Sequence, residues 1–311
     1  MTIASKKSLK ANSSTASPFV KWAGGKRKLA PLLIETFPEG FDPLRHRYFE
    51  PFIGGGALMF ALGDETKDFF IPGRNLFIND LNPELTNVYE VIRDNVTRLI
   101  KALDLLSKKI DEKSFYEIRA TVPRGKVARA ARFIYLNKTC FNGLWRVNSS
   151  GDFNVPFGKS KSPSLYDEAN LRACSKRLKG STITNLNFDN AVAKAKKGDL
   201  VYFDPPYIPL TPSASFSAYA KEGFGQREHE LLAETIQKLS DKNVYVLLSN
   251  SDTPLTRKIF KRVITLRKVL MARSISSSGS TRKPVYEVLG MNYAHLSGSA
   301  MGNLDLISRP N

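Results

Sequence analysis

The sequence predicts an α/β protein with a doubly wound sheet and an inserted, mostly helical subdomain. Near the start of the folded part, two short apolar strands alternate with two helical patterns, and the same alternation returns after residue 199. A doubly wound sheet separates its first and fourth strands by about three βα units, or roughly 90 residues. Gly56 and Asp204 are 148 positions apart. The separation exceeds the expected one, and the additional residues indicate an insertion between the two halves of the sheet.

The first half of the sheet opens with two strand and helix pairs. Residues 47–52 (RYFEPF) form an aromatic strand that runs into three glycines, and residues 57–62 continue as a helix. Residues 76–80 (LFIND) form the second strand. Asn82 and Pro83 are typical of the cap and first position of a second helix. This order predicts parallel strands with helices on both faces. The second helix repeats apolar residues at i, i+3, i+4 and i+7: Leu85, Val88, Tyr89 and Ile92.

The second half of the sheet begins with a buried strand at residues 199–203 (DLVYF), which ends in the segment 204–207 (DPPY). A helix follows at 226–239 and another strand at 244–248. We place the insert at 94–178, where the composition becomes basic. The rest of the chain divides into a flexible basic leader (1–17), one discontinuous sheet domain (18–93 and 179–295) and a C-terminal tail (296–311).

The charge balance predicts a polyanionic partner. The chain has 47 Lys and Arg residues against 29 Asp and Glu residues, a formal net charge of +18. With 42% hydrophobic and 10% aromatic residues, it is too apolar for a disordered polymer. The positive charge therefore lies on the surface of a folded protein, where it attracts phosphate backbones or acidic membranes.

Several classes of protein are excluded. No apolar stretch reaches the ~18 residues that span a bilayer, and residues 1–17 lack the apolar segment of a secretory signal. Cys140 and Cys174 cannot build a disulfide framework, and three scattered histidines provide no zinc-ligand spacing. We expect a cytoplasmic protein with reduced thiols, no metal and no membrane partner.

Two basic stretches favour nucleic acid over a membrane. Residues 119–146 hold seven basic residues and no acidic one, and residues 257–283 hold nine and none. The second stretch includes the Ser-rich segment 273–283, whose hydroxyl and backbone N–H groups can approach phosphates closely. The first is interleaved with aromatic residues, which suits nucleic acid; alternatively, they belong to a core and the charges to a solvated face. These aromatic residues are Phe133, Tyr135, Phe141 and Trp145.

A glycine turn at residues 50–56 (EPFIGGG) lies where the first strand meets the first helix, at the sheet edge where such folds bind ligands. It lacks the GxGxxG spacing of a pyrophosphate site, so a nucleoside without phosphates fits better. An ordinary tight turn is about equally well supported. Asp80 follows Gly56 by 24 positions, close to the ~20 expected for a carboxylate that binds ribose hydroxyls. A helix cap is the other interpretation of Asp80.

The segment Asp204-Pro205-Pro206-Tyr207 carries the sharpest chemical signal. Two prolines stiffen the exit of a buried strand, but a rigid exit requires neither the Asp nor the Tyr. An exocyclic amine on an aromatic ring is a poor nucleophile, because its lone pair is delocalised into the ring. The Asp204 carboxylate and the Pro205 carbonyl can accept its two N–H groups, and Tyr207 can stack on the base. Such a base has to leave the double helix, so we expect base flipping.

The ordered motifs resemble those of the Dam-type, D12 class DNA adenine-N6 methyltransferases, which use S-adenosylmethionine. The motifs, which extend from Phe19 to Tyr293, are VKWAGGK, FEPFIGGGA, NDLN, FNGLWRVNSSGDFNVPFGK, VYFDPPY, VLLSNSDT and RSISSSGSTRK. The resemblance implies a Rossmann-like methyltransferase sheet whose insert is a DNA target-recognition subdomain. It also implies S-adenosyl-L-methionine as cofactor, S-adenosylhomocysteine as product, double-stranded DNA as partner, and a monomer associated with the nucleoid. The implied cofactor contacts are Trp22, Lys26, Glu50, Phe52, Gly54, Gly56, Asp80 and Asp204.

The resemblance further implies residues that read the DNA sequence. Arg146 stands where an arginine reads a guanine, and Leu144 and Pro156 stand where apolar side chains meet a thymine methyl group. Both pairings have a direct physical basis in the major groove. Phe141, which is Tyr in one family member, stands where an aromatic ring enters the base stack. This set looks like the pattern that reads GATC. The remaining matches are Lys21, at the first guanine, and Asn142.

The expected reaction is direct transfer of a methyl group from the sulfonium to adenine N6. No covalent enzyme intermediate is required, so neither cysteine is a nucleophile. Asp204 and the Pro205 carbonyl orient the amine, with Pro206 stiffening the turn. Tyr207 clamps the base together with Phe216 or Tyr219.

Three alternatives remain open. The acceptor could be adenine in RNA, cytosine N4 or a protein glutamine; basic reading loops argue against the protein. An NAD-type oxidoreductase is disfavoured by the missing GxGxxG motif. A non-catalytic DNA-binding protein needs only the basic stretches, but it leaves the DPPY motif and the glycine turn unexplained.

Overall fold

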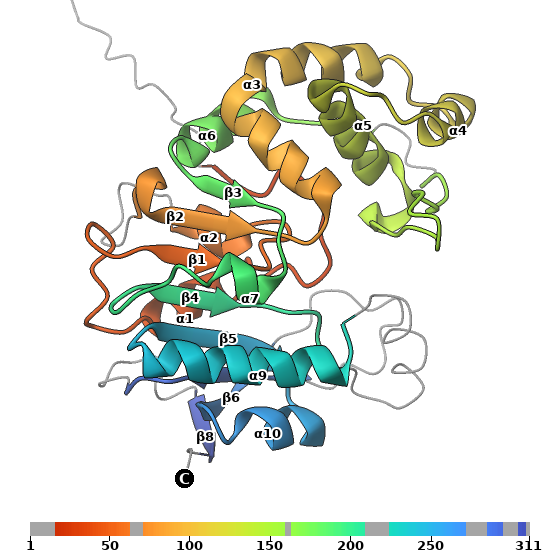
Figure 1. The fold of residues 1–311 in the computed structure, drawn as a ribbon. Coiled ribbons are helices and arrows are strands. Elements are labelled where there is room, and N and C mark those ends of the chain that lie inside the picture. Colours follow the sequence, from red (N-terminus) through yellow and green to blue (C-terminus); the bar gives the residue numbers. More distant parts are fainter. Residues whose placement is uncertain are drawn as a thin grey trace, which may run out of the picture.

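The computed structural model describes residues 16–62, 71–158, 163–208, 224–271, 285–294 and 304–308. Its strands form one sheet in the order β3-β2-β1-β4-β5-β7-β6-β8 (Figure 1). The chain reverses its direction of winding between β1 and β4, which is where doubly wound sheets bind ligands. The strands are β1 (Tyr48–Glu50), β2 (Leu76–Asn79), β3 (Thr182–Thr184), β4 (Leu200–Phe203), β5 (Tyr245–Ser251), β6 (Thr265–Met271), β7 (Val285–Met291) and β8 (Leu304–Ser308).

The four strands expected from the sequence are present as β1, β2, β4 and β5, and they pair in parallel as expected. The expectation of a wholly parallel sheet is wrong at one side. β7 pairs antiparallel with both β5 and β6, and β8 pairs antiparallel with β6. Antiparallel neighbours do not need the long crossover that parallel neighbours require. The segment that we assigned to a C-terminal tail thus contributes β8 to the sheet.

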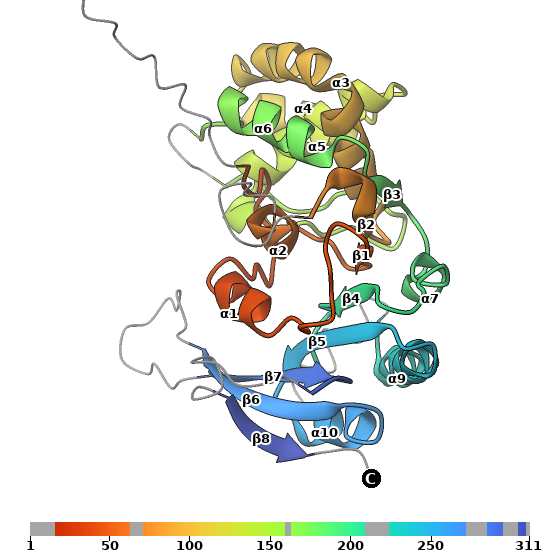
Figure 2. The ribbon, with the colours of Figure 1, turned by 90° about the vertical axis from the view of Figure 1, so that its left-hand side faces the viewer.

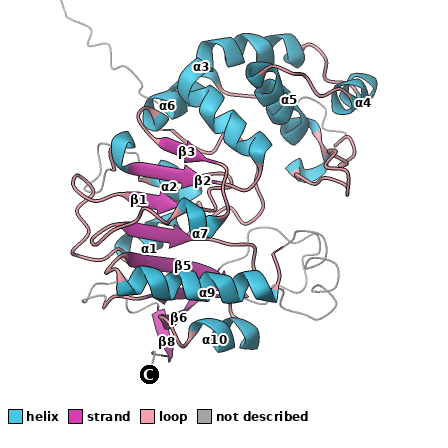
Figure 3. Ribbon diagram, in the orientation of Figure 1, coloured by secondary structure: helices cyan, strands magenta, loops and turns pink. Residues whose placement is uncertain are grey.

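Helices cover both faces of the sheet, as the sequence predicts. Figure 2 shows α7 and α9 on one face and α1 and α2 on the other. Beyond β3, a layer of four helices, α3 to α6, extends past the edge of the sheet (Figure 3). The described helices are α1 (Ala30–Glu35), α2 (Ala57–Ala61), α3 (Pro83–Ser107), α4 (Glu112–Ala120), α5 (Lys126–Thr139), α6 (Glu168–Leu178), α7 (Phe188–Ala191), α9 (Gln226–Asp241) and α10 (Pro254–Phe260).

Helix α3 connects the sheet with this helical layer. Asn82 caps it by accepting hydrogen bonds from the backbone N–H groups of Glu84 and Leu85, and Pro83 occupies its first position, as expected. The boundary that we predicted at residue 94 falls inside the helix. Next to it, Asn95 has a φ of −140°, which breaks the helical geometry. The helix therefore changes direction as it leaves the sheet.

Candidate active site

The carboxyl ends of β1, β2 and β4 bring three predicted acidic residues to one edge of the sheet. Glu50 is the last residue of β1, Asp80 follows β2, and Asp204 follows β4. β1 lies between β2 and β4 in the sheet. Residues from three distant parts of the sequence are thereby placed at the switch point of the fold.

Asp80 links the glycine turn to the start of α3 through the two oxygens of its carboxylate. The backbone N–H of Gly54 donates to Oδ2 and that of Asn82 donates to Oδ1, each over 3.0 Å. Burial raises the pKa of Asp80, while these two hydrogen bonds act in the opposite direction. Asp80 therefore helps to fix the start of α3, as the capping interpretation requires, and it also shapes the turn. Its contact with a ribose stays a prediction.

Two glycines of the turn have left-handed backbones and no room for a side chain. Gly54 has φ +47°, and a Cβ there would lie 2.7 Å from Cδ1 of Trp22. Gly56 has φ +71°, and a Cβ there would lie 2.7 Å from the hydroxyl oxygen of Tyr89. Tyr89 also donates a hydrogen bond to the Gly54 carbonyl (2.9 Å). The glycines are thus required by conformation and by close packing.

Glu50 is buried beneath the turn, with 3% of its surface exposed. The Tyr48 hydroxyl donates to its Oε2 over 2.9 Å. Burial raises the pKa of Glu50 to about 8, although the hydrogen bond from Tyr48 and the charge of Arg177 lower it. Phe52, another predicted cofactor contact, packs against Phe188 with 5.4 Å between the ring centroids.

Asp204 accepts a chain of hydrogen bonds from the neighbouring strand. Ser249 of β5 donates to Oδ1 of Asp204 over 2.8 Å, and Tyr202 lies 2.9 Å from the Ser249 hydroxyl. The Lys26 ammonium lies 3.3 Å from the same carboxylate oxygen. Burial raises the pKa of Asp204, while Lys26 lowers it. The structure therefore joins two predicted residues, Lys26 and Asp204, and adds Ser249 and Tyr202, which sequence reasoning missed.

Glu287 of β7 is a further residue that sequence reasoning missed. Its Oε2 accepts a hydrogen bond from the Tyr207 hydroxyl (2.9 Å) and lies 3.9 Å from the Lys26 ammonium. Lys26 also lies 4.3 Å from the centre of the Tyr207 ring. The sequence did contain a feature that distinguishes this residue, because Glu287 is the only acidic residue between Asp252 and Asp305.

The predicted DNA-reading residues of the insert lie together on a loop between α5 and α6. The loop is closed by isolated bridges that pair residues 140 with 157 and 147 with 153. The Phe141 N–H donates to the Pro156 carbonyl over 2.9 Å, and Asn142 has a left-handed φ of 54°. Phe141 and Leu144 are 51% and 44% exposed. Arg146 is also exposed and donates to Oδ1 of Asn154 over 2.7 Å.

Asn137, which sequence reasoning missed, attaches Lys21 to this loop. The Lys21 N–H donates to Asn137 Oδ1 over 2.8 Å, and Asn137 Nδ2 donates to the carbonyls of Lys21 (2.8 Å) and Gly143 (2.9 Å). Asn137 is fully buried. All six predicted reading residues are therefore brought to one region, although their roles stay predictions.

The interpretation of the other aromatic residues in 119–146 as nucleic-acid contacts is wrong. Phe133 and Tyr135 are buried in the core. Trp145 stacks on Phe133 with 3.8 Å between ring centroids, and Trp22 also stacks against Phe133, with 6.3 Å between ring centroids. Arg132 is also buried, where it donates to the carbonyls at the end of α4. These side chains pack inside the helical layer, and of the four aromatic residues only Phe141 is exposed.

Several expectations lie outside the described residues. These are Phe216 and Tyr219, the basic segment 273–283, and the leader up to residue 15. Ser17, which we assigned to the leader, is described, and its N–H donates to Oδ1 of Asn170 in α6 over 2.8 Å. The leader therefore ends before Ser17.

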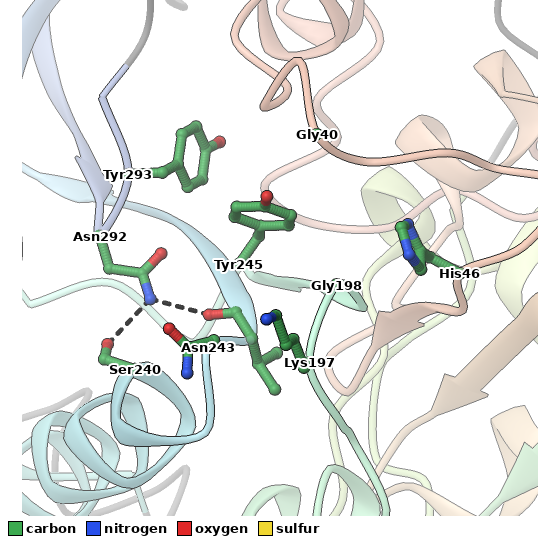
Figure 4. Close-up of a pocket in the computed structure, with 10 residues that line it drawn as sticks. Gly40, His46, Lys197, Gly198, Ser240, Asn243, Tyr245, Asn292 and Tyr293 are labelled. Carbon is green, nitrogen blue, oxygen red and sulfur yellow. Dashed lines mark hydrogen bonds between the residues drawn. The ribbon is translucent and has the colours of Figure 1, made fainter.

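A cavity of about 500 Å³ lies at the opposite edge of the sheet (Figure 4). Its lining includes Gly198 before β4, Tyr245 at the start of β5 and Asn292 after β7. The Asn292 amide donates to the Ser240 hydroxyl and the Val244 carbonyl, each over 2.8 Å. None of the predicted site residues lines this cavity.

The family model for the D12 class N6 adenine-specific DNA methyltransferases matches residues 22–274. The chain belongs to this family. It is similar to the Type II methyltransferase M1.LlaDCHI of Lactococcus lactis subsp. cremoris, with 36% identity over 295 residues, 92% of this chain and 99% of the relative. Similarity to the Type II methyltransferase M.MjaIII of Methanocaldococcus jannaschii is 37% over 291 residues, 89% and 99% of the two chains. Similarity to the DNA adenine methylase of Escherichia coli (strain K12) is 33% over 277 residues, 88% and 94%.

Family membership decides between the alternatives that the sequence left open. This D12 class methyltransferase is an enzyme that acts on adenine N6 in DNA, and its family implies S-adenosylmethionine as methyl donor. Both cysteines are buried, and burial raises the pKa of Cys140 to about 11 and that of Cys174 to about 12. Neither thiol is therefore prepared to act as a nucleophile.

Two features are absent from the described part of this methyltransferase. No group of three or more His, Cys, Asp or Glu side chains is arranged to hold a metal ion. No helix within the described ranges has both the length and the apolar character needed to cross a membrane.

Proposed function

We propose that this methyltransferase modifies the adenine of GATC in duplex DNA after flipping that base out of the helix. The observation that carries the proposal is the joint exposure of Phe141 and Leu144 on a hydrogen-bonded loop that also presents Arg146. An exposed aromatic ring can enter the base stack, and an exposed arginine can form a bidentate contact with guanine. The same loop is attached through Asn137 to Lys21, five positions before the active-site Lys26.

In the proposed reaction, the Asp204 carboxylate and the Pro205 carbonyl accept hydrogen bonds from the two N–H groups of adenine N6. Ser249 and Lys26 both contact Oδ1 of Asp204, which fixes the orientation of the carboxylate. We therefore assign the other oxygen, Oδ2, to the amine. A bond forms between N6 and the methyl carbon while the bond from that carbon to sulfur breaks. N6 then loses one proton, for which the Asp204 carboxylate is the first acceptor. Orientation of the two reactants supplies much of the rate.

The glycine turn fits a nucleoside-like methyl donor. The left-handed Gly54 and Gly56 carry no side chains of their own at the switch point, which lets Trp22 and Tyr89 pack closely against the turn. Leu81, which follows Asp80, is 67% exposed, and such a large apolar side chain at a ligand-binding edge suits the flat face of an adenine. S-adenosylmethionine supplies an electrophilic methyl group on a sulfonium. We assign its binding to the turn, Asp80, Trp22 and the buried Glu50.

The test is to methylate a plasmid of known sequence with purified enzyme and map N6-methyladenine at single-base resolution. We expect methylation at GATC and roughly 5- to 150-fold less at sites that differ by one base pair, since a mismatch typically costs ~1–3 kcal/mol. Methylation at a different motif would contradict the proposed specificity while leaving the family assignment intact. As a control, substitution of Arg146 by Ala should relax selectivity at a guanine without abolishing transfer.

A further inference from the structure

Glu287 reaches the active site from a part of the fold that the family motifs do not include. It lies on β7, where it pairs with Ser251 of β5 on one side and Val269 of β6 on the other. Its carboxylate is mostly buried, with 16% exposure. A mostly buried carboxylate requires partners, because desolvation of an unpaired charge is unfavourable.

The partners of Glu287 are both members of the active-site cluster. The Tyr207 hydroxyl donates to its Oε2 over 2.9 Å, and the Lys26 ammonium lies 3.9 Å from the same oxygen. Lys26 is itself 7% exposed and is anchored by a hydrogen bond to the Gly24 carbonyl (3.0 Å). The Tyr207 ring is therefore held at its hydroxyl end by Glu287 and faces Lys26, 4.3 Å from the ring centre.

The second carboxylate also changes the charge balance of the cluster. One ammonium, Lys26, faces both Asp204 and Glu287. Burial raises the pKa of Glu287, while Lys26 and the hydrogen bond from Tyr207 lower it. The same cation lowers the pKa of Asp204. Glu287 thus shares its stabilising cation with the residue that is to receive the target amine.

We propose that Glu287 is a positioning residue that fixes the Tyr207 ring beside Asp204 for methyl transfer. The inference rests on the proposed function, in which Tyr207 stacks on the flipped adenine. A tyrosine ring at the end of a loop has two rotatable bonds, and a hydrogen bond at its hydroxyl restricts both. A charge-assisted hydrogen bond is about twice as strong as a neutral one, so a carboxylate acceptor suits this task. Loss of Glu287 leaves the ring present but removes this acceptor, so that the hydroxyl keeps only its interactions with Asp204 and Ser249.

The test is a double-mutant cycle on the single-turnover rate at saturating DNA and cofactor. We expect Glu287→Ala to lower this rate by about 30-fold or more, because misplaced reactants lose much of their rate. In the Tyr207→Phe background, which keeps the ring but removes the hydroxyl, the same change should lower the rate by about fivefold or less. Glu287→Gln, whose amide oxygen can accept the hydroxyl proton, should restore most of the lost rate.

Measurements of cofactor-analogue binding and of stability distinguish a positioning role of Glu287 from a general loss of binding or of folding stability. The dissociation constant of sinefungin, measured by calorimetry, and the melting temperature should be similar in Glu287→Ala and the parent enzyme. Glu234→Ala, at an exposed position of α9, is the matched control and should leave every quantity unchanged. If Glu287→Ala fails to fold, Glu287→Leu, which fills the same volume with an apolar side chain, takes its place in the cycle.

Two outcomes overturn the inference. One is a single-turnover rate of Glu287→Ala within threefold of the parent, and the other is an equal loss in both backgrounds. Failure of the proposed function is distinguishable, because the parent enzyme itself would then transfer no methyl group to GATC. In that case the cycle is repeated with the DNA site that the plasmid map identifies.

Discussion

Asp204 is a mostly buried carboxyl group with a cation beside it: Ser249 donates to one of its oxygens, and Lys26 lies 3.3 Å from the same oxygen. Burial raises the pKa of Asp204, while Lys26 and Ser249 lower it. Glu50 is also buried, and burial raises its pKa to about 8 even though the Tyr48 hydroxyl donates a hydrogen bond that lowers it. We therefore assign different functions to the two carboxyl groups, although they lie at the ends of neighbouring strands. Under the proposed function Asp204 orients the target amine, and Glu50 supports the glycine turn.

Substitution of Asp204 by Asn tests the first function. The amide keeps the size of the side chain but removes its charge and replaces one acceptor oxygen with a donor. We expect the single-turnover rate of methyl transfer to fall by more than ~100-fold, since orienting groups act directly on the reacting amine. Asp241→Asn, at the exposed end of α9, is the control. A rate within about threefold of the parent would remove Asp204 from the mechanism.

Substitution of Glu50 by Gln tests the second function through pH. The pKa of Glu50 is raised to about 8 in the folded protein but is about 4.3 in an unfolded chain. The unfolded state therefore releases the proton first, and stability is lost as pH rises between these values, by up to about 1.4 kcal/mol per pH unit. Glu50→Gln removes this loss, so its stability relative to the parent should increase from pH 5 to pH 8 in urea titrations. A constant difference across that range would show that Glu50 is ionised in the folded state.

At the scale of elements, the glycine turn and the reading loop both depend on backbone conformations that few residues adopt. Gly56 and Asn142 each occupy the left-handed region. In the turn, this conformation directs the chain from β1 into α2. In the loop, the left-handed conformation of Asn142 lies between Phe141 and Leu144, whose side chains are both exposed. In both elements, a sharp backbone turn at one residue positions the residues that we predict to contact a ligand.

Gly56→Ala tests the packing of the turn, and Gly151→Ala is its matched control. Both glycines have left-handed backbones, but a Cβ at Gly151 would meet nothing within 4 Å, whereas one at Gly56 would meet Tyr89. We expect Gly151→Ala to destabilise the protein by about 1 kcal/mol through conformation alone. Gly56→Ala should cost about 2 kcal/mol more, because the clash adds to the strain. Equal losses in denaturant titrations would show that Tyr89 moves freely aside.

The sequence predicted those elements whose signals are local. Asn82 and Pro83 defined the start of α3. The pattern of apolar residues and the length of each segment defined β1, β2, β4, β5 and α9. β8 and the antiparallel placement of β7 depend on pairing between distant segments, which no local pattern encodes. The burial of Phe133 and Trp145 was missed for the same reason, because a core aromatic and a base-stacking aromatic look alike in sequence.

At the scale of the whole molecule, the active site is assembled from the two ends and the middle of the chain. Lys26 precedes the first strand, Asp204 follows the fourth, and Glu287 lies on the seventh. Their sequence separation explains why motif reasoning found Lys26 and Asp204 but not Glu287. The first two belong to motifs with recognisable chemistry, whereas Glu287 reaches Lys26 and Tyr207 only because β7 pairs beside β5.

The net charge of +18 predicts strongly salt-dependent binding to DNA. Neutralised phosphates release counterions, so the logarithm of the association constant should fall with the logarithm of salt concentration, with a slope of about −5 or steeper. The measurement is a titration of a duplex that lacks GATC, between 50 and 200 mM NaCl. Sinefungin binding over the same range is the control and should change by less than about twofold. A DNA slope shallower than about −2 would show that most of the charge faces away from the duplex.

The late position of β7 in the chain has a consequence during translation. A ribosome that has not yet incorporated Glu287 carries a polypeptide with its glycine turn and Asp204 already synthesised, but with the Tyr207 hydroxyl lacking its acceptor. Methylation by such a nascent polypeptide should therefore be weak. If Glu287 positions Tyr207 as proposed, full activity requires that β7 has been synthesised, and a premature stop codon anywhere before this strand should yield a deficient product.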